Sequence, residues 1–243
     1  MDLKPFFNYY GGKWRVGRYY PRPRHTTIVE PFAGAAGYSV RHYQADVVLV
    51  DLDPVVAGVW DYLIHVTSAE VNRLPVKINH VDEIRGPQEA RWLVGFWLNK
   101  GAAPAKTPGA WMRAGQHSTS FWGPEIQRRI STQVSYIRHW KSFNKSYQAG
   151  AQSKAATYFV DPPYSDLCGS LYRTKFTDYA ELGSWCQNRS GQVIVCEKYG
   201  ADWLPFRAFK DIKSMEGVRG KAVSREVIWS HNNAPTTRMK TAR

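Results

Sequence analysis

The stretch TIVEPFAGAAG at residues 27–37 decides the fold class, because it joins a short apolar run to a turn of small residues. The next apolar run, residues 46–50, is β-branched and almost entirely apolar, as in a strand that is covered on both faces. Asp51 follows that run, and Pro54 can open a helix that extends to about Val66. The order strand, helix, strand, helix is typical of an α/β sheet with parallel strands.

The same alternation returns in the last third of the chain, whereas the middle has a different pattern. The late elements that we expect are a strand at 157–161, a helix at 178–188, a strand at 192–196 and two strands near 207–212 and 225–229. In the middle we expect helices at 87–99 and 123–143, which have apolar side chains at helical spacing, and a loop at 100–120. The expected division is an α/β domain at 1–67 and 157–230, a mainly helical insert at 68–156 and a flexible basic tail at 231–243.

Composition excludes several classes of protein. Hydrophobic residues make up 43% of the 243 residues and charged residues 22%, which suits a globular chain rather than a disordered one. No apolar run approaches the roughly 20 residues that cross a bilayer, and the first residues lack the apolar stretch of a signal peptide. The three cysteines, Cys168, Cys186 and Cys196, have no CxxC spacing, so we expect a reducing cytoplasm and neither a disulfide framework nor a metal site.

The charge balance indicates a polyanionic partner. Lys and Arg number 33 against 20 Asp and Glu, which gives a net charge of +13, and the usual cytoplasmic polyanion is nucleic acid. The basic side chains of the middle region that are candidates for DNA phosphate contacts are Lys100, Arg113, Arg128, Arg129 and Lys141. A helix face that bears Arg is often only solvated, so each of these remains a candidate.

The sharpest chemical signal is Asp161-Pro162-Pro163-Tyr164, which lies at the end of an apolar strand. Active groups in open α/β sheets lie at the carboxyl ends of strands. The prolines fix the backbone and remove two donors, so a carboxylate stands beside bare carbonyl groups. Such acceptors suit a ligand with an exocyclic NH2 group, and Tyr164 offers a face on which a planar ring can stack.

Two further segments suit a nucleoside-containing ligand. The small residues around Gly34 let a ligand approach the backbone, and the carboxylate of Asp51 can accept hydrogen bonds from ribose hydroxyls. Near the N-terminus, Gly11 and Gly12 allow a close turn, and Lys13 can pair with a carboxylate. Neither segment matches the GxGxxG or P-loop spacing.

Taken in order, the segments Tyr9–Lys13, Glu30–Gly34, Asp51 and Asp161–Tyr164 resemble those of Dam-type adenine-N6 DNA methyltransferases, the D12 class or alpha group of amino-methyltransferases. The resemblance spans most of the chain, since that family also carries a variable target-recognition region before its DPPY motif. It implies a Rossmann-like methyltransferase fold that uses S-adenosylmethionine as cofactor and double-stranded DNA as partner.

The resemblance also implies roles for individual residues. The catalytic residues that it implies, which hold a flipped adenine, are Asp161, Pro162, Pro163 and Tyr164. The cofactor-binding residues that it implies are Tyr9, Gly12, Lys13, Pro31, Phe32, Gly34, Asp51 and Asp161. This chain departs from the family at Tyr9, where a Trp is usual, and at Ala36, where a Gly is usual.

Several readings stay open at this level. The resemblance favours adenine N6 in DNA as the methyl acceptor. Cytosine N4, adenine in RNA and a small molecule are alternative acceptors. A non-catalytic nucleic-acid-binding module is an alternative of another class. We expect a monomer or weak dimer in the cytoplasm of a bacterium or a phage-infected host, either solitary or paired with a restriction enzyme.

Overall fold

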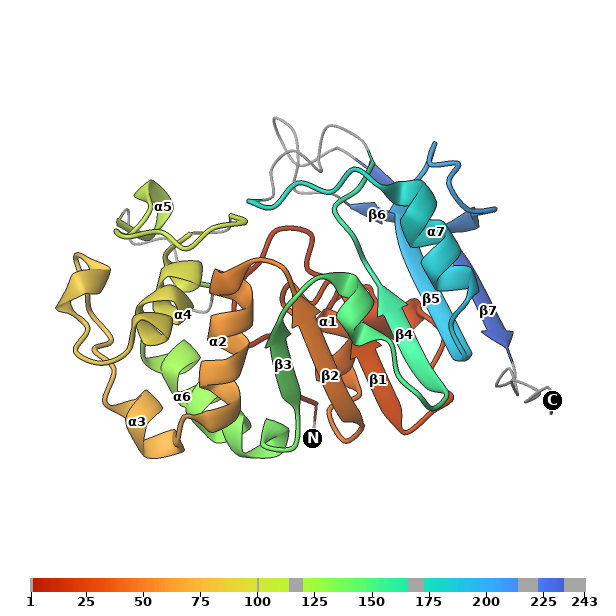
Figure 1. Cartoon of the computed structure of the whole chain (residues 1–243). Coiled ribbons are helices and arrows are strands. Elements are labelled where there is room, and N and C mark those ends of the chain that lie inside the picture. Colours follow the sequence, from red (N-terminus) through yellow and green to blue (C-terminus); the bar gives the residue numbers. More distant parts are fainter. Residues whose placement is uncertain (1, 100, 114–119, 166–172, 214–222, 234–243) are drawn as a thin grey trace.

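A seven-stranded sheet forms the frame of the computed structural model, which describes residues 2–99, 101–113, 120–165, 173–213 and 223–233 (Figure 1). Its strands are β1 (Thr27–Glu30), β2 (Asp46–Asp51), β3 (Lys141–Asn144), β4 (Ala156–Val160), β5 (Gly191–Lys198), β6 (Arg207–Lys213) and β7 (Val223–Asn233). They lie in the order β3-β2-β1-β4-β5-β7-β6.

The direction of the strands identifies the fold. The first five strands of that order are parallel, whereas β7 enters antiparallel between β5 and β6. The chain order reverses at β1, which has β2 on one side and β4 on the other, so ligands are expected at the carboxyl ends of these strands. This is the strand order of the Rossmann-like methyltransferase fold, and the expected α/β fold class is confirmed.

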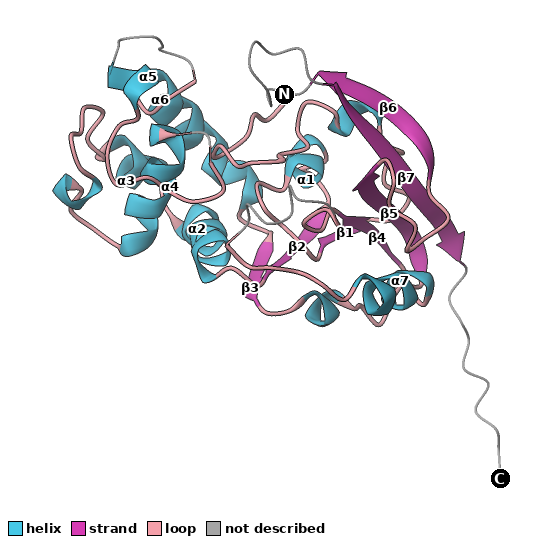
Figure 2. Ribbon diagram, turned by 90° about the horizontal axis from the view of Figure 1, so that it is seen from above, coloured by secondary structure: helices cyan, strands magenta, loops and turns pink. Residues whose placement is uncertain are grey.

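Helices cover both faces of the sheet (Figure 2). Those outside the middle region are α1 (Gly37–Arg41), α2 (Pro54–His65) and α7 (Tyr179–Gln187), with short 3-10 turns at Gly17–Tyr19 and Tyr147–Gly150. Alternate residues of β5 face opposite ways: Ile194 belongs to the larger apolar core, and Val193 to the smaller core under α7. The sheet therefore carries one core on each face.

The middle of the chain is mainly helical, as expected. Its helices are α3 (Ser68–Asn72), α4 (Gln88–Leu98), α5 (Ala110–Arg113) and α6 (Pro124–Gln133), with 3-10 turns at Val81–Glu83 and Val134–Ile137. Ile126 and Ile130 of α6 are fully buried in the same apolar cluster as Ile28 of β1. The insert therefore packs into the larger core of the sheet instead of enclosing a core of its own.

The single helix expected over residues 123–143 is wrong. After α6 and the 3-10 turn, buried Trp140 donates its indole N–H to the Tyr43 carbonyl at 3.1 Å, and residues 141–144 become the edge strand β3. Pairing with β2 satisfies the backbone hydrogen bonds of this short segment, which a helix would have satisfied within itself. The sheet thus takes a strand from within residues 68–156, the range expected to be the insert.

Two smaller expectations also change. Residues 110–113, inside the expected loop at 100–120, form α5. Strand β7 continues to Asn233, so the first three residues of the expected tail belong to the sheet, and residues 234–243 lie outside the described residues. Among the described residues, no helix has both the length and the apolar character needed to span a membrane.

Candidate active site

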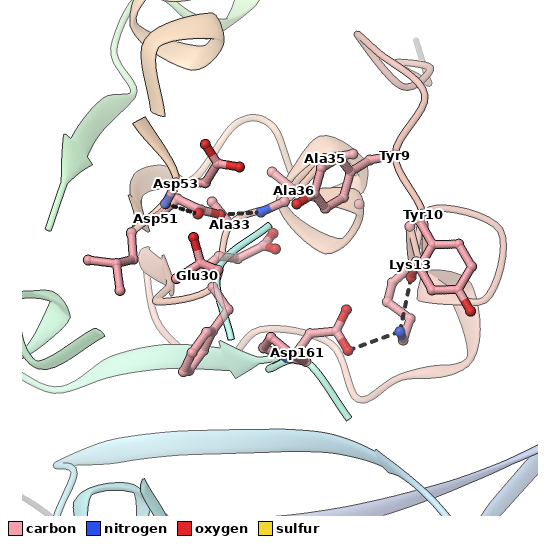
Figure 3. A pocket seen from close by; sticks show the side chains of 18 of the residues that line it. Tyr9, Tyr10, Lys13, Glu30, Ala33, Ala35, Ala36, Asp51, Asp53 and Asp161 are labelled. Atoms are coloured by element: carbon pink, nitrogen blue, oxygen red, sulfur yellow. Dashed lines mark hydrogen bonds and ion pairs between the residues drawn. The ribbon is translucent and has the colours of Figure 1, made fainter. Parts of the chain in front are cut away.

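A pocket opens at the carboxyl ends of β1, β2 and β4, and segments far apart in the chain meet there (Figure 3). Its walls are residues 9–13, Glu30, residues 32–37 and 51–53, Phe159, Asp161, Pro163 and residues 174–176. Of the expected cofactor residues, Tyr9, Gly12, Lys13, Phe32, Gly34, Asp51 and Asp161 line this pocket, whereas Pro31 is buried outside the lining. The structure therefore brings together nearly all of the residues that the sequence assigned to one ligand.

The turn after β1 is held in a left-handed shape. Gly34 has φ 44° and Ala36 has φ 46°, and the Ala36 N–H donates to the Ala33 carbonyl at 2.6 Å. The buried indole N–H of Trp60 donates to the Gly34 carbonyl at 2.7 Å, which fixes the turn from behind. Ala36 therefore adopts the conformation that a glycine would take more easily, at a cost of about 1–2 kcal/mol.

Gly37 lets the N-terminal segment lie directly against this turn. A Cβ atom on Gly37 would lie 2.3 Å from the Trp14 nitrogen and 2.8 Å from the Lys13 carbonyl carbon. Both of these are backbone atoms, so a small rotation of a side chain cannot relieve the overlap. The absence of a side chain at Gly37 is what allows residues 9–13 to reach the pocket.

Asp51 links the turn to the end of β2. One carboxylate oxygen accepts a hydrogen bond from the Gly34 N–H and the other from the Asp53 N–H, both at 2.9 Å. Burial raises the pKa of Asp51 to about 6, although these two bonds lower it. Each carboxylate oxygen has a second lone pair, so Asp51 can still accept hydroxyl donors from a ligand.

Lys13 and Asp161 form the charged pair at the centre of the pocket. Lys13 is buried, and its Nζ lies 2.9 Å from Asp161 Oδ1 while it donates to the Gly11 carbonyl at 3.0 Å. Burial raises the pKa of Asp161 to about 6, and Lys13 opposes that rise. The N-terminal lysine thus supports the ionised form of the carboxylate that follows β4.

Tyr164 lies on the far side of this pair, outside the pocket lining. Lys13 Nζ is 4.8 Å from the centre of its ring, within the range of a cation–π contact. Of the other two residues of the motif, Pro162 is buried, and the Pro163 carbonyl accepts the Tyr179 hydroxyl at 2.8 Å. The Asp-Pro-Pro-Tyr segment is therefore fixed at several points along its length.

The sequence analysis missed four side chains that shape this region. Glu226 of β7 accepts the Tyr164 hydroxyl at 2.5 Å, and Glu197 of β5 accepts the Ser165 N–H at 3.3 Å. At the other end of the pocket, Arg173 Nε lies 3.3 Å from Asp53 Oδ2. Glu197 and Glu226 could have been noticed in the sequence because each is an acidic residue within an apolar run. The sequence alone does not indicate which loop each side chain contacts.

Of the five candidate DNA contacts, the four that the structure describes do not line the pocket. Arg129 is half-buried, stacks over Trp97 at 5.0 Å and donates to the Pro5 carbonyl at 3.2 Å, so it ties α6 to the N-terminal segment. Arg113 and Arg128 are exposed on α5 and α6, and Lys141 begins β3 at the end of the sheet away from the pocket. Lys100 lies outside the described residues.

Among the described residues, no group of three or more His, Cys, Asp or Glu side chains is placed to hold a metal ion. The pocket instead offers backbone groups, carboxylates and aromatic faces, which are the groups that bind a nucleoside.

Exchanging the residue types at 36 and 37 tests how the turn is built. Gly37→Ala should displace residues 13–14 and weaken binding of a nucleoside cofactor at least tenfold, because the added Cβ meets backbone. Ala36→Gly should leave binding unchanged and raise the free energy of unfolding by up to about 1 kcal/mol, because it relieves the left-handed alanine. Calorimetry and thermal unfolding of both variants check this, and tight binding by Gly37→Ala would contradict it.

Comparisons with known proteins bear on the fold and not on the substrate. No protein-family model and no curated protein matches the chain. Among solved structures, one similar chain is a Haemophilus influenzae protein described provisionally as a methylase, with a TM-score of 0.33 and 12% sequence identity, covering 90% of this chain and 84% of that one. This likeness is distant, so the functional conclusion depends on the strand order and on the residues of the pocket.

Proposed function

We propose that the protein transfers a methyl group from S-adenosylmethionine to N6 of an adenine that is flipped out of double-stranded DNA. The observation that carries the proposal is the Lys13–Asp161 pair, 2.9 Å apart, in the same pocket as the turn at Gly34 and the acid Asp51. An oriented carboxylate beside a nucleoside-type pocket is what amino methylation requires.

The pocket residues fit the cofactor. The small residues 33–37 line the pocket, so a ligand can approach their backbone, and Asp51 offers acceptors for ribose hydroxyls. Exposed Leu52 and half-buried Phe32 give apolar surface for the adenine ring. When bound, S-adenosylmethionine supplies the methyl group from a positively charged sulfonium.

The acceptor side is formed by the Asp-Pro-Pro-Tyr segment. Asp161 accepts an N–H of the target amino group, and the Pro162 carbonyl accepts the other. Both bonds orient the nitrogen lone pair towards the methyl donor, and orientation of this kind contributes about 7–11 kcal/mol to catalysis. Tyr164 stacks on the base and offsets part of the cost of removing it from the duplex.

The net charge supports DNA as the substrate. A charge of +13 favours binding to a polyanion and implies an affinity that falls steeply with salt. Lys175 lines the pocket and adds positive charge there. A small-molecule acceptor would need no such excess.

Asp161→Asn should lower the rate of methyl incorporation into duplex DNA by about 100-fold or more, because the amide presents an N–H donor where the amino group needs an acceptor. Binding of S-adenosylmethionine should change less than the rate, since the amide oxygen of Asn can still accept from Lys13 and the turn and Asp51 remain. Initial rates with radiolabelled cofactor, together with calorimetry, check both expectations.

Asp46→Asn is the matched control for Asp161→Asn. It removes the same charge from an exposed position at the amino end of β2, away from the pocket. Equal rates for the two variants would mean that Asp161 has no special role, and the proposed acceptor site would then be wrong.

The pH dependence of methyl transfer should reflect the ionisation of Asp161 beside Lys13. Since the pKa of Asp161 is raised to about 6, transfer should fall as the pH drops through that value and the carboxylate takes up a proton. Lys13→Met removes a group that lowers this pKa, so the acid limb of the kcat profile should move to higher pH, whereas Lys13→Arg should move it less.

Saturating cofactor keeps the titration of Asp51, whose pKa is also raised to about 6, from being mistaken for that of Asp161. Lys13 is not among the causes of the Asp51 shift. An acid limb at the same pH in Lys13→Met and the wild type would contradict the proposed pairing.

A further inference from the structure

Glu226 is a buried carboxylate in the middle of β7, behind the proposed acceptor site. Its side chain accepts a hydrogen bond from the Tyr164 hydroxyl at 2.5 Å. Tyr164 is half-buried, and its ring faces Lys13 at 4.8 Å. Glu226 therefore lies at one end of a chain of contacts that continues through Tyr164 and Lys13 to Asp161.

Strands on both sides fix the position of this carboxylate. In the antiparallel ladders, Glu226 stands opposite Lys198 of β5 and opposite Lys210 of β6. A residue held between two paired strands has little freedom to move along or across the sheet. The Tyr164 hydroxyl is thus anchored to a strand that is paired on both sides, although Tyr164 itself follows the strand β4 in a loop.

Burial of the Glu226 carboxylate costs free energy that its partners must offset. Neighbouring Val227 and Ile228 are buried and apolar, and Ile228 belongs to the larger core. The Tyr164 hydroxyl is one partner of Glu226, and the cross-strand lysines of β5 and β6 stand on either side of it.

We propose that Glu226 is a positioning residue that fixes the plane of the Tyr164 ring for stacking against the target base; this rests on the proposed methyl transfer. The ring is held at its hydroxyl by Glu226 and lies beside the Lys13 ammonium, so it is presented in one orientation before the base arrives. A ring that is already oriented loses less conformational freedom when the base stacks on it. Neither Tyr164 nor Glu226 lines the cofactor pocket, so the effect falls on the acceptor side.

A double-mutant cycle tests this assignment with Tyr164→Phe, Glu226→Leu and the combined variant. Each single change should lower kcat/KM for DNA by about 10- to 100-fold, because each removes the same hydrogen bond. The combined variant should lose no more than the larger single loss, since the bond is already absent. Glu226→Gln, which keeps an acceptor oxygen, should retain more activity than Glu226→Leu.

The cofactor affinity of all variants should equal that of the wild type by calorimetry, because a general loss of structure would weaken it. Asp211→Asn is the matched control: it removes an exposed carboxylate from neighbouring β6 and should leave methyl transfer unchanged. Should Glu226→Leu fail to fold, Tyr164→Phe decides, because it removes a single oxygen atom.

Losses that multiply in the combined variant, or a wild-type rate in Tyr164→Phe, would overturn the role of Glu226 while leaving the proposed function intact. Absence of methyl transfer by the wild-type protein in the same assay would overturn the proposed function and this role with it.

Discussion

A buried lysine joins the beginning of the chain to the end of its central strand. Lys13 contacts Asp161 across the pocket, and Gly37 allows the backbone at Lys13 and Trp14 to approach the turn that follows β1. The two contacts bring residues 9–13, the turn at Gly34 and the Asp-Pro-Pro-Tyr segment to one place. A charge buried in this way is stable only with its partner, so the geometry of the pocket depends on the pair.

In the proposed reaction the carboxylates around the pocket have separate tasks because their surroundings differ. Asp51 is held by backbone N–H groups and would face the cofactor, whereas Asp161 is paired with an ammonium and would face the acceptor base. Glu30 is fully buried, accepts the Ser39 N–H at 2.7 Å, and has its pKa raised to about 8 by burial. Burial therefore favours the neutral form of Glu30.

The sequence predicted the parts of the structure that depend on local chemistry. The apolar runs that end in Asp51 and Asp161 predicted two strands and the edge of the sheet at which both strands end. The turn around Gly34 predicted one wall of the pocket. What it missed depends on long-range pairing. Lys141–Asn144 is a strand only because β2 offers it an edge, and Glu226 reaches Tyr164 only because β7 inserts beside β5. Arg129 was one candidate for a DNA contact, and its packing over Trp97 was not visible from spacing along the helix.

The most direct test of the central claim is the identity of the methylated nucleoside. Mixed-sequence duplex DNA is incubated with the protein and tritium-labelled S-adenosylmethionine, digested to nucleosides and separated by chromatography. The account predicts label in N6-methyldeoxyadenosine. Label in N4-methyldeoxycytidine would contradict the adenine assignment, and the absence of label from DNA would contradict the proposed function as a whole.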